Sequence, residues 1–144
     1  MPEPTIAECN AAALLRQVAA VQTPGRVQFA AADGLNLRAD ADQLQQALIN
    51  LVRNAVEATP AGGAPVELRA VRGKDSVVFE VEDSGPGVAN PDNLFVPFFT
   101  TKPGGSGIGL VLSRRIAESH GGSVALKNRD DGRGAEALVR LPLP

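Results

Sequence analysis

The stretch that decides the fold is SVVFEVEDSGPGV at residues 76–88, which reads as a strand that runs into a tight turn. Side chains alternate along a strand, so Val77, Phe79 and Val81 share one face and Asp83 continues on it. A carboxylate at the end of an apolar face is costly unless it finds a partner. The plain interpretation is a strand-end aspartate bonded to its own turn, which is common. The alternative is a buried carboxylate that accepts a hydrogen bond from a ligand, such as the amino group of a base.

Upstream of this strand, residues 41–59 have the pattern of the longest helix in the chain. Asn50 falls on its polar side and Asn54 at the border of its apolar side, one helical turn apart. Two solvated asparagines are one interpretation. The other is a rim position where amide oxygens meet a ligand or a metal, and such oxygens suit Mg²⁺. The apolar stripe of this helix contains Leu44, Ala47, Leu48, Leu51, Ala55 and Ala58.

Downstream of the strand, the run FFTTKPGGSGIGL at residues 98–110 places glycines and a lysine directly before a helix predicted over 108–119. The first amides of a helix are unpaired and lie at its positive end, and glycines let a phosphate approach them. The run lacks the Gly-Lys-Ser/Thr ending of a P-loop, and no clear strand leads into it as a dinucleotide-binding fingerprint requires. A flexible connector remains the plain interpretation.

The composition is that of an ordinary soluble globular protein: 144 residues, 44% hydrophobic, 21% charged and a net charge of −2. It argues against a general nucleic-acid or membrane-surface binder. No apolar stretch approaches the ~20 residues that span a bilayer, and the first residues have no secretory-signal pattern. Cys9 is the only cysteine and His120 the only histidine, which excludes an internal disulfide and a multi-histidine metal site.

The order of elements predicts an α+β two-layer sandwich, in which a mixed, mostly antiparallel sheet is covered on one face by about three helices. Residues 83–107 have no periodicity, and a loop of that length in a compact domain is typical of a functional lid or of a disordered segment. The predicted elements are helices at 10–22, 41–59 and 108–119, a hairpin of strands at 27–30 and 35–38 around Asp33-Gly34, and strands at 66–71, 76–82, 123–128 and 136–141.

Four segments resemble, in the correct order, the N, G1, F and G2 boxes of the ATP-binding domain of sensor histidine kinases. They are NLVRNAVEAT (50–59), DSGPGV (83–88), LFVPFFTTK (94–102) and GGSGIGL (104–110). RIAESHGGSV (115–124) resembles the stretch after the G2 box, and LLRQV (14–18) resembles the linker of nitrogen-regulation-type kinases. The resemblance covers about residues 10–142. It implies a Bergerat fold: a single domain over 1–144, with a linker remnant at 1–9 and an ATP lid at 90–106.

The resemblance implies a site for ATP and Mg²⁺. Asn54 matches the asparagine that ligands magnesium, and Asp83 matches the aspartate that reads the adenine amino group. Asn50 stands where related gyrase- and MutL-type ATPases are expected to carry a glutamate base. An amide cannot take a proton from water near neutral pH, so this site looks poorly equipped for hydrolysis. The expected ATP-binding set is Asn50, Asn54, Asp83, Gly85, Gly87, Val88, Thr101, Lys102, Gly105, Ser106, Gly107, Ile108, Gly109 and Leu110.

Other positions match the family or depart from it. The F-box phenylalanines are expected to dock the lid on the body or on a partner, and Arg53 and Glu57 to contact phosphate or the partner. Ala135 lacks the hydroxyl that many relatives place near adenine, and Glu57 and Ala58 replace a basic and an aromatic residue. His120 is expected to be structural rather than phosphorylated. The F-box set is Phe95, Phe98 and Phe99.

The function implied is that of a catalytic domain that donates the γ-phosphoryl group of ATP to a histidine on a separate dimerisation domain, in bacterial two-component signalling. A response regulator is then an indirect partner, and no catalytic residue is certain within the chain. A monomeric, cytoplasmic domain without direct contact to nucleic acid or membrane is expected, even where the parent kinase is membrane-anchored. Three alternatives stay open: an ATPase of the wider superfamily, a serine-directed anti-sigma-type kinase, and a degenerate nucleotide-sensing or docking module.

Overall fold

The structure is a computed structural model, and it describes residues 3–32, 34–60, 62–85, 108–129 and 134–143. Its described elements follow one another as β1 (Ala7–Asn10), α1 (Ala11–Ala20), β2 (Val27–Ala31), β3 (Asn36–Ala39), α2 (Ala41–Ala58), β4 (Val66–Arg72), β5 (Ser76–Glu82), α3 (Ile108–Ser119), β6 (Ser123–Asn128) and β7 (Ala135–Pro142).

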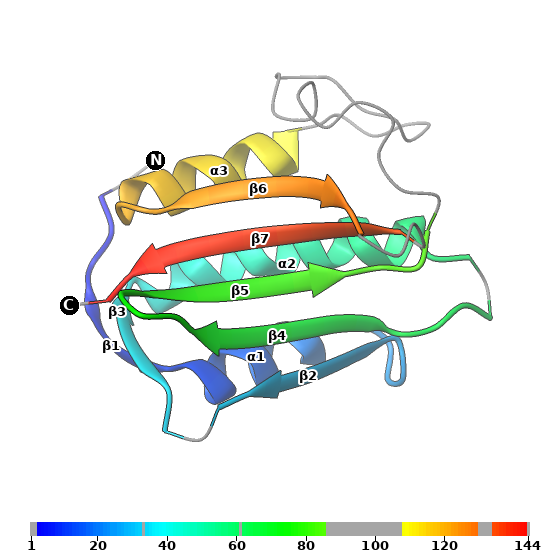
Figure 1. The fold of residues 1–144 in the computed structure, drawn as a ribbon, viewed down its shortest axis with the longest axis horizontal. Helices are drawn as coiled ribbons and strands as arrows, with labels where there is room; N and C mark the ends of the chain where they lie inside the picture. The colour runs from blue at the N-terminus through cyan, green and yellow to red at the C-terminus, as the bar shows by residue number, and fades with distance from the viewer. Residues whose placement is uncertain (1–2, 33, 61, 86–107, 130–133, 144) are drawn as a thin grey trace.

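The main sheet has five strands in the order β2-β4-β5-β7-β6. The β2–β4 pair is parallel, and the other three pairs are antiparallel. The helices lie together on one face of this sheet (Figure 1). The prediction of an α+β two-layer sandwich with a mixed, mostly antiparallel sheet is therefore confirmed.

The core forms between the helices and the inner face of the sheet. Val77, Phe79 and Val81 of β5 are at most 2% exposed, and the central leucines of α2 pack against this face of the sheet. The predicted alternation in the strand is confirmed, because its periodicity matches strand geometry. The predicted stripe along α2 is confirmed except at Ala58, which is half-buried, and the buried face also includes Asn50 and Val52. Asp83 continues the inner face and is 7% exposed, as the alternation predicts.

The hairpin predicted around Asp33-Gly34 is wrong. Gly34 does turn the chain with a φ of 70°, but the two flanking strands do not pair with each other. β2 pairs in parallel with β4, whereas β3 pairs antiparallel with β1 in a separate two-stranded sheet, with Cys9 opposite Leu37. A turn signal is local, but strand pairing depends on burial. Leu37 of β3 is 2% exposed in this arrangement. Its strand pairs with β1, which the sequence pattern does not predict as a strand.

Helix ends follow local chemistry. Asp40 caps α2, since its Oδ1 accepts the N–H of Gln43 at 3.1 Å. α3 ends at Ser119, and two residues later Gly121 adopts a left-handed φ of 78°, so that the N–H of Gly122 donates back to the carbonyl of Ala117 at 2.9 Å. Across the described ranges, no helix is long and apolar enough to cross a membrane.

Candidate functional site

Asp83 lies directly after β5, and its carboxylate is held by one oxygen. Its Oδ1 accepts the N–H of Gly85 at 2.9 Å and the N–H of Ala135 at 3.0 Å. The backbone N–H of Asp83 in turn donates to the carbonyl of Ala135 at 3.0 Å. Among the described residues, no hydrogen bond reaches Oδ2. The turn bond expected of an ordinary strand-end aspartate is thus present, but it occupies only half of a carboxylate that is 7% exposed.

Two glycines allow close packing around the turn at Asp83, Gly85 against Ala58 and Gly134 against Asp83 itself. A Cβ on Gly85 would lie 2.4 Å from the carbonyl oxygen of Ala58 at the end of α2. A Cβ on Gly134 would lie 2.0 Å from the carbonyl oxygen of Asp83. No side chain fits at either distance, so only glycine permits this packing. Gly134 is absent from the predicted site; the signal that points to it is the Gly-Arg-Gly run at 132–134 before the closing strand.

The two asparagines of α2 lead toward this turn. Asn50, Asn54 and Ala58 are four residues apart, so they form one line along the helix that ends beside Gly85. Measured from Ala58, Asn54 lies about 6 Å and Asn50 about 12 Å back along the axis. Asn50 is 9% exposed and accepts the side-chain N–H of Gln46 at 3.3 Å. Asn54 is half-buried. The interpretation of two solvated asparagines is therefore wrong for Asn50.

The first turn of α3 lies beside the part of α2 that carries Asn50 and Asn54. The Ser113 hydroxyl donates to the carbonyl of Ala47 at 3.0 Å, and the His120 imidazole meets the N–H of Asp40. Seven residues back along α3 therefore correspond to seven residues forward along α2, so the helices run antiparallel (Figure 1). Continuing this register places the first turn of α3, at Ile108, level with about Val52. The unpaired amides of that turn thus lie between the levels of Asn50 and Asn54.

Part of the predicted site lies outside the described residues. Leu110, in the first turns of α3, is half-buried against the core. Arg53 and Glu57 are exposed on α2. The lid predicted at 90–106 and its F-box phenylalanines fall in the range 86–107, which the structure does not describe. The same holds for Gly87, Val88, Thr101, Lys102, Gly105, Ser106 and Gly107.

The face of the sheet away from the helices carries charged residues behind Asp83. Arg129 donates through Nη1 to the carbonyl of Asp83 at 3.1 Å, and its Nε lies 3.5 Å from Oε2 of Glu82. Glu136 of β7 lies directly opposite Glu82 of β5. Nζ of Lys127 lies 3.5 Å from Oε1 of Glu136. Burial raises the pKa of Glu136, and the neighbouring Glu82 raises it further.

A metal ion at this site would be coordinated by amide oxygens of the protein and by the phosphates of a bound molecule. Within the described ranges, no group of three or more histidine, cysteine, aspartate or glutamate side chains could hold one. The amide oxygen of Asn54 is a hard donor that suits Mg²⁺, which commonly takes one or two protein ligands and completes its octahedron with phosphate and water. The donor set therefore fits a magnesium ion that arrives with a phosphorylated ligand.

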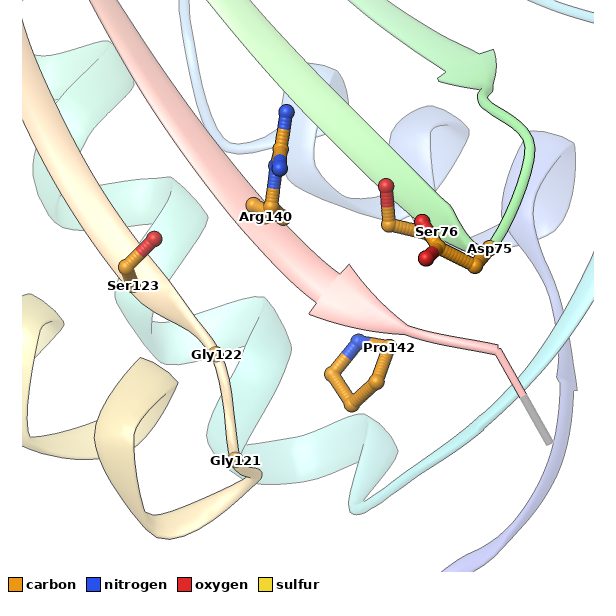
Figure 2. A pocket seen from close by; sticks show the side chains of 7 residues that line it. All are labelled: Asp75, Ser76, Gly121, Gly122, Ser123, Arg140 and Pro142. Atoms are coloured by element: carbon orange, nitrogen blue, oxygen red, sulfur yellow. The ribbon is translucent and has the colours of Figure 1, made fainter.

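A separate hollow lies at the other end of β5. It has a volume of about 310 Å³, and Ser76, the first residue of β5, lines it together with Arg140 of β7 (Figure 2). None of the predicted site residues lines it. The other lining residues are Asp75, Gly121, Gly122, Ser123 and Pro142.

Comparison with known proteins defines the class of protein. The sequence profile described as "Histidine kinase-, DNA gyrase B-, and HSP90-like ATPase" matches residues 39–144. The chain therefore belongs to the family of histidine kinase-, DNA gyrase B- and HSP90-like ATPases.

Within this family, the similar proteins are sensor kinases. The chain is 39% identical over 122 residues to the sensor histidine kinase ZraS of Salmonella typhi, covering 82% of this chain and 26% of that protein. It is 42% identical over 114 residues to the sensor protein kinase PilS of Pseudomonas aeruginosa, covering 75% of this chain and 21% of that protein. The chain thus spans about a quarter of the length of these relatives.

Solved structures of histidine kinases share the fold. Full-length ShkA in complex with AMPPNP superposes with a TM-score of 0.85 at 33% identity, over 99% of this chain and 32% of that one. The catalytic domain of the histidine kinase ThkA superposes with a TM-score of 0.82 at 30% identity, over 96% of both chains. The expected Bergerat-type architecture is therefore confirmed, and the chain corresponds to the ATPase domain of sensor histidine kinases.

Proposed function

We propose that this chain binds Mg-ATP and donates the γ-phosphoryl group to a histidine on a separate dimerisation domain. The observation that carries the proposal is the half-occupied carboxylate of Asp83. Its Oδ1 is bonded to the N–H groups of Gly85 and Ala135, and no hydrogen bond from the described residues reaches Oδ2, which can therefore accept from a ligand. The exocyclic amino group of adenine is a donor of the right kind. A buried carboxylate that accepts such a bond discriminates strongly against a base that lacks the donor.

The phosphates would extend from the turn at Asp83 along α2 toward the first amides of α3. This direction follows from the line of Asn50, Asn54 and Ala58 and from the antiparallel register of the two helices. The helix start supplies unpaired N–H groups and a partial positive charge, both of which favour phosphate. Lys102 and the glycines at 104–109 are proposed to complete the phosphate site from the lid.

Asn54 is proposed as the protein ligand of magnesium. When bound, the ion neutralises charge on the transferring phosphoryl group. The part of this chain is to hold the ion and the phosphates in one orientation. Asn50 cannot act as a base toward water, so we expect γ-phosphate to be retained for an incoming imidazole rather than hydrolysed.

The histidine acceptor and any group that assists it would come from the dimerisation domain, and a response regulator would take the phosphoryl group afterwards. We propose that the reaction runs in the cytoplasm, where ATP is supplied. ZraS and PilS are named as sensor kinases, which supports this assignment over a serine-directed kinase or a docking module.

Calorimetric titration of Mg-ATP into the wild type and Asp83→Asn tests the proposal. The two N–H donors at Oδ1 will orient the amide oxygen of asparagine toward themselves, so its NH₂ group will take the place of Oδ2. It then opposes the adenine amino group and favours a 6-oxo purine. We expect loss of ATP binding by about tenfold or more, with gain of ITP binding.

Asp75→Asn is the matched control, because it makes the same chemical change at the other end of β5. Its carboxylate is exposed and lies far from the proposed site, so binding should equal that of the wild type. Equal ATP affinity in the wild type and Asp83→Asn would show that Asp83 does not bind adenine. Absence of ATP binding in both proteins would favour the docking-module alternative.

A further inference from the structure

The side chain of Arg129 braces Asp83 from behind. Arg129 directly follows β6, and its backbone N–H donates to the carbonyl of Gly134 at 2.8 Å. Its guanidinium donates to the carbonyl of Asp83 at 3.1 Å and lies 3.5 Å from the carboxylate of Glu82. β5 and β6 end, and β7 begins, at the same end of the strands of the sheet (Figure 1). The Asp83 carboxylate points to the helix layer, so Arg129 holds the same residue from the opposite face.

The surroundings of Arg129 explain why a cation lies there. Lys127 pairs with Glu136 in the β6–β7 ladder, and alternation brings Arg129 to the same face. Glu82 and Glu136 are directly opposite each other on β5 and β7, and their side chains are each 16% exposed. Like charges in such a pair repel. A cation beside them lowers that repulsion, and the planar fork of arginine can serve a carboxylate and a carbonyl together.

We propose that Arg129 is a positioning residue for Asp83 and sets its selectivity for a 6-amino purine. The inference rests on the proposed function, because it assumes that Asp83 reads adenine. The carbonyl of Asp83 lies beyond the end of the strand, where its peptide plane is free to rotate unless it is bonded. Arg129 fixes that plane, and the N–H of Gly85, two residues on, then stays in line with Oδ1. Oδ2 therefore keeps the single orientation that the purine amino group requires.

Arg69 provides a matched control on the same face. It bonds Glu80 at 3.1 Å and also bonds Glu82, the carboxylate that Arg129 approaches. Its partners lie on β5 within the ladder, and the contacts that the structure assigns to it do not include Asp83. Arg69→Met thus removes a comparable pair of charge contacts from the same row without releasing the Asp83 carbonyl.

The test compares dissociation constants for Mg-ATP and Mg-ITP in the wild type, Arg129→Met and Arg69→Met by calorimetry. ITP carries an oxygen where ATP carries the amino group. We expect Arg129→Met to lower the ATP preference by about threefold to tenfold, the effect of one net hydrogen bond. Arg69→Met should keep the wild-type ratio within about twofold, although both variants lose thermal stability.

An unchanged ratio in Arg129→Met, or an equal change in Arg69→Met, overturns the inference. Should Arg129→Met not fold, Arg129→Gln is measured by the same criterion, since it keeps a polar group but is too short to reach both acceptors. A wild type that binds ATP and ITP equally contradicts the proposed role of Asp83 itself, so the two failures are distinguishable.

Discussion

The imidazole of His120 accepts the backbone N–H of Asp40 through Nε2 at 3.0 Å, across eighty residues of chain. Its Nδ1 lies 2.8 Å from the carbonyl oxygen of Ile116. Because Nε2 is the acceptor, Nδ1 carries the proton and donates to that carbonyl. Asp40 also accepts the N–H of Thr5 at 2.9 Å. One histidine therefore connects the end of α3 to the start of α2 and, through Asp40, to the entering chain.

His120→Ala should lower the free energy of unfolding by about 1–3 kcal/mol, because it leaves the Asp40 N–H and the Ile116 carbonyl without this partner. Urea denaturation measures the change. Glu118→Gln is the control: it removes an exposed pair with Arg114 on the same helix, worth about 0.3–0.5 kcal/mol. Since both nitrogens of the ring are engaged, incubation with Mg-ATP should leave His120 unphosphorylated by mass spectrometry. A phosphoryl group on this residue contradicts a structural role.

The pH dependence of stability should contain a contribution from Asp40. The N–H of Thr5, followed by that of Gln43, lowers the pKa of this carboxyl below its ordinary value of 3.8. A carboxyl with a lowered folded-state pKa stabilises the protein above the ordinary pKa, and that stability is lost as the pH falls through the folded-state pKa. The difference in urea midpoint between wild type and Asp40→Asn should therefore be largest above about pH 4 and shrink toward pH 2.

Asp42→Asn changes a carboxylate in the same helical turn and serves as the control for Asp40. Its side chain is exposed, so its difference from wild type should stay small throughout. A difference for Asp40→Asn that does not vary with pH would argue against the linkage.

Glu136→Gln should raise stability at neutral pH. Burial, and then Glu82, raise the pKa of Glu136 above its ordinary value of 4.5. A group with a raised folded-state pKa contributes stability below the ordinary pKa and loses it as the pH rises through the folded-state pKa. Chemical denaturation should show the variant to be more stable than wild type at pH 7, with the two converging near pH 4. Glu118→Gln should show no such gain, and equal behaviour of both variants would contradict the carboxylate pair.

Gly134→Ala tests the close approach at Asp83. The new Cβ would lie 2.0 Å from the Asp83 carbonyl oxygen, at a φ of 151°. Overpacking costs about 1–3 kcal/mol and backbone strain adds to it, so we expect a loss of about 3 kcal/mol. Gly62→Ala also has a positive φ, of 79°, but its Cβ would meet nothing within 4 Å, so only about 1–2 kcal/mol should be lost. Thermal unfolding that shows equal losses would argue that strain alone matters at Gly134.

Asn54→Ala should separate magnesium-dependent from magnesium-independent binding. If Asn54 ligands the ion, the variant should bind Mg-ATP about tenfold more weakly and bind ATP in EDTA as the wild type does. Calorimetry with and without Mg²⁺ makes the comparison. Gln45→Ala, on the same helix and bonded to Gln17, should match the wild type under both conditions. Equal weakening of ATP binding with and without Mg²⁺ would show that Asn54 is not a ligand of the magnesium ion.

The helices, every strand except β1 and several of the buried faces follow from the sequence alone. The apolar alternation of β5 and the stripe of α2 predicted most of the side chains that are buried in these elements, since strand and helix periodicities are local properties of the backbone. The same local logic put Asp83 on the inner face and predicted the bounds of α3 at 108 and 119. The four boxes at 50–59, 83–88, 94–102 and 104–110 also predicted the family.

Tertiary structure alone decided which strands pair and how Asp83 is held. β3 pairs with β1 and not with β2, its predicted hairpin partner. Strand pairing depends on which distant segments are buried together, and a turn signal such as Asp33-Gly34 carries no information about that. The bonds from Ala135 and Arg129 to Asp83 join residues about fifty positions apart, and the clearance at Gly134 exists only when β5 and β7 lie side by side. Contacts of this kind depend on the packing of the whole sheet, so they cannot be predicted from periodicity and spacing along the chain.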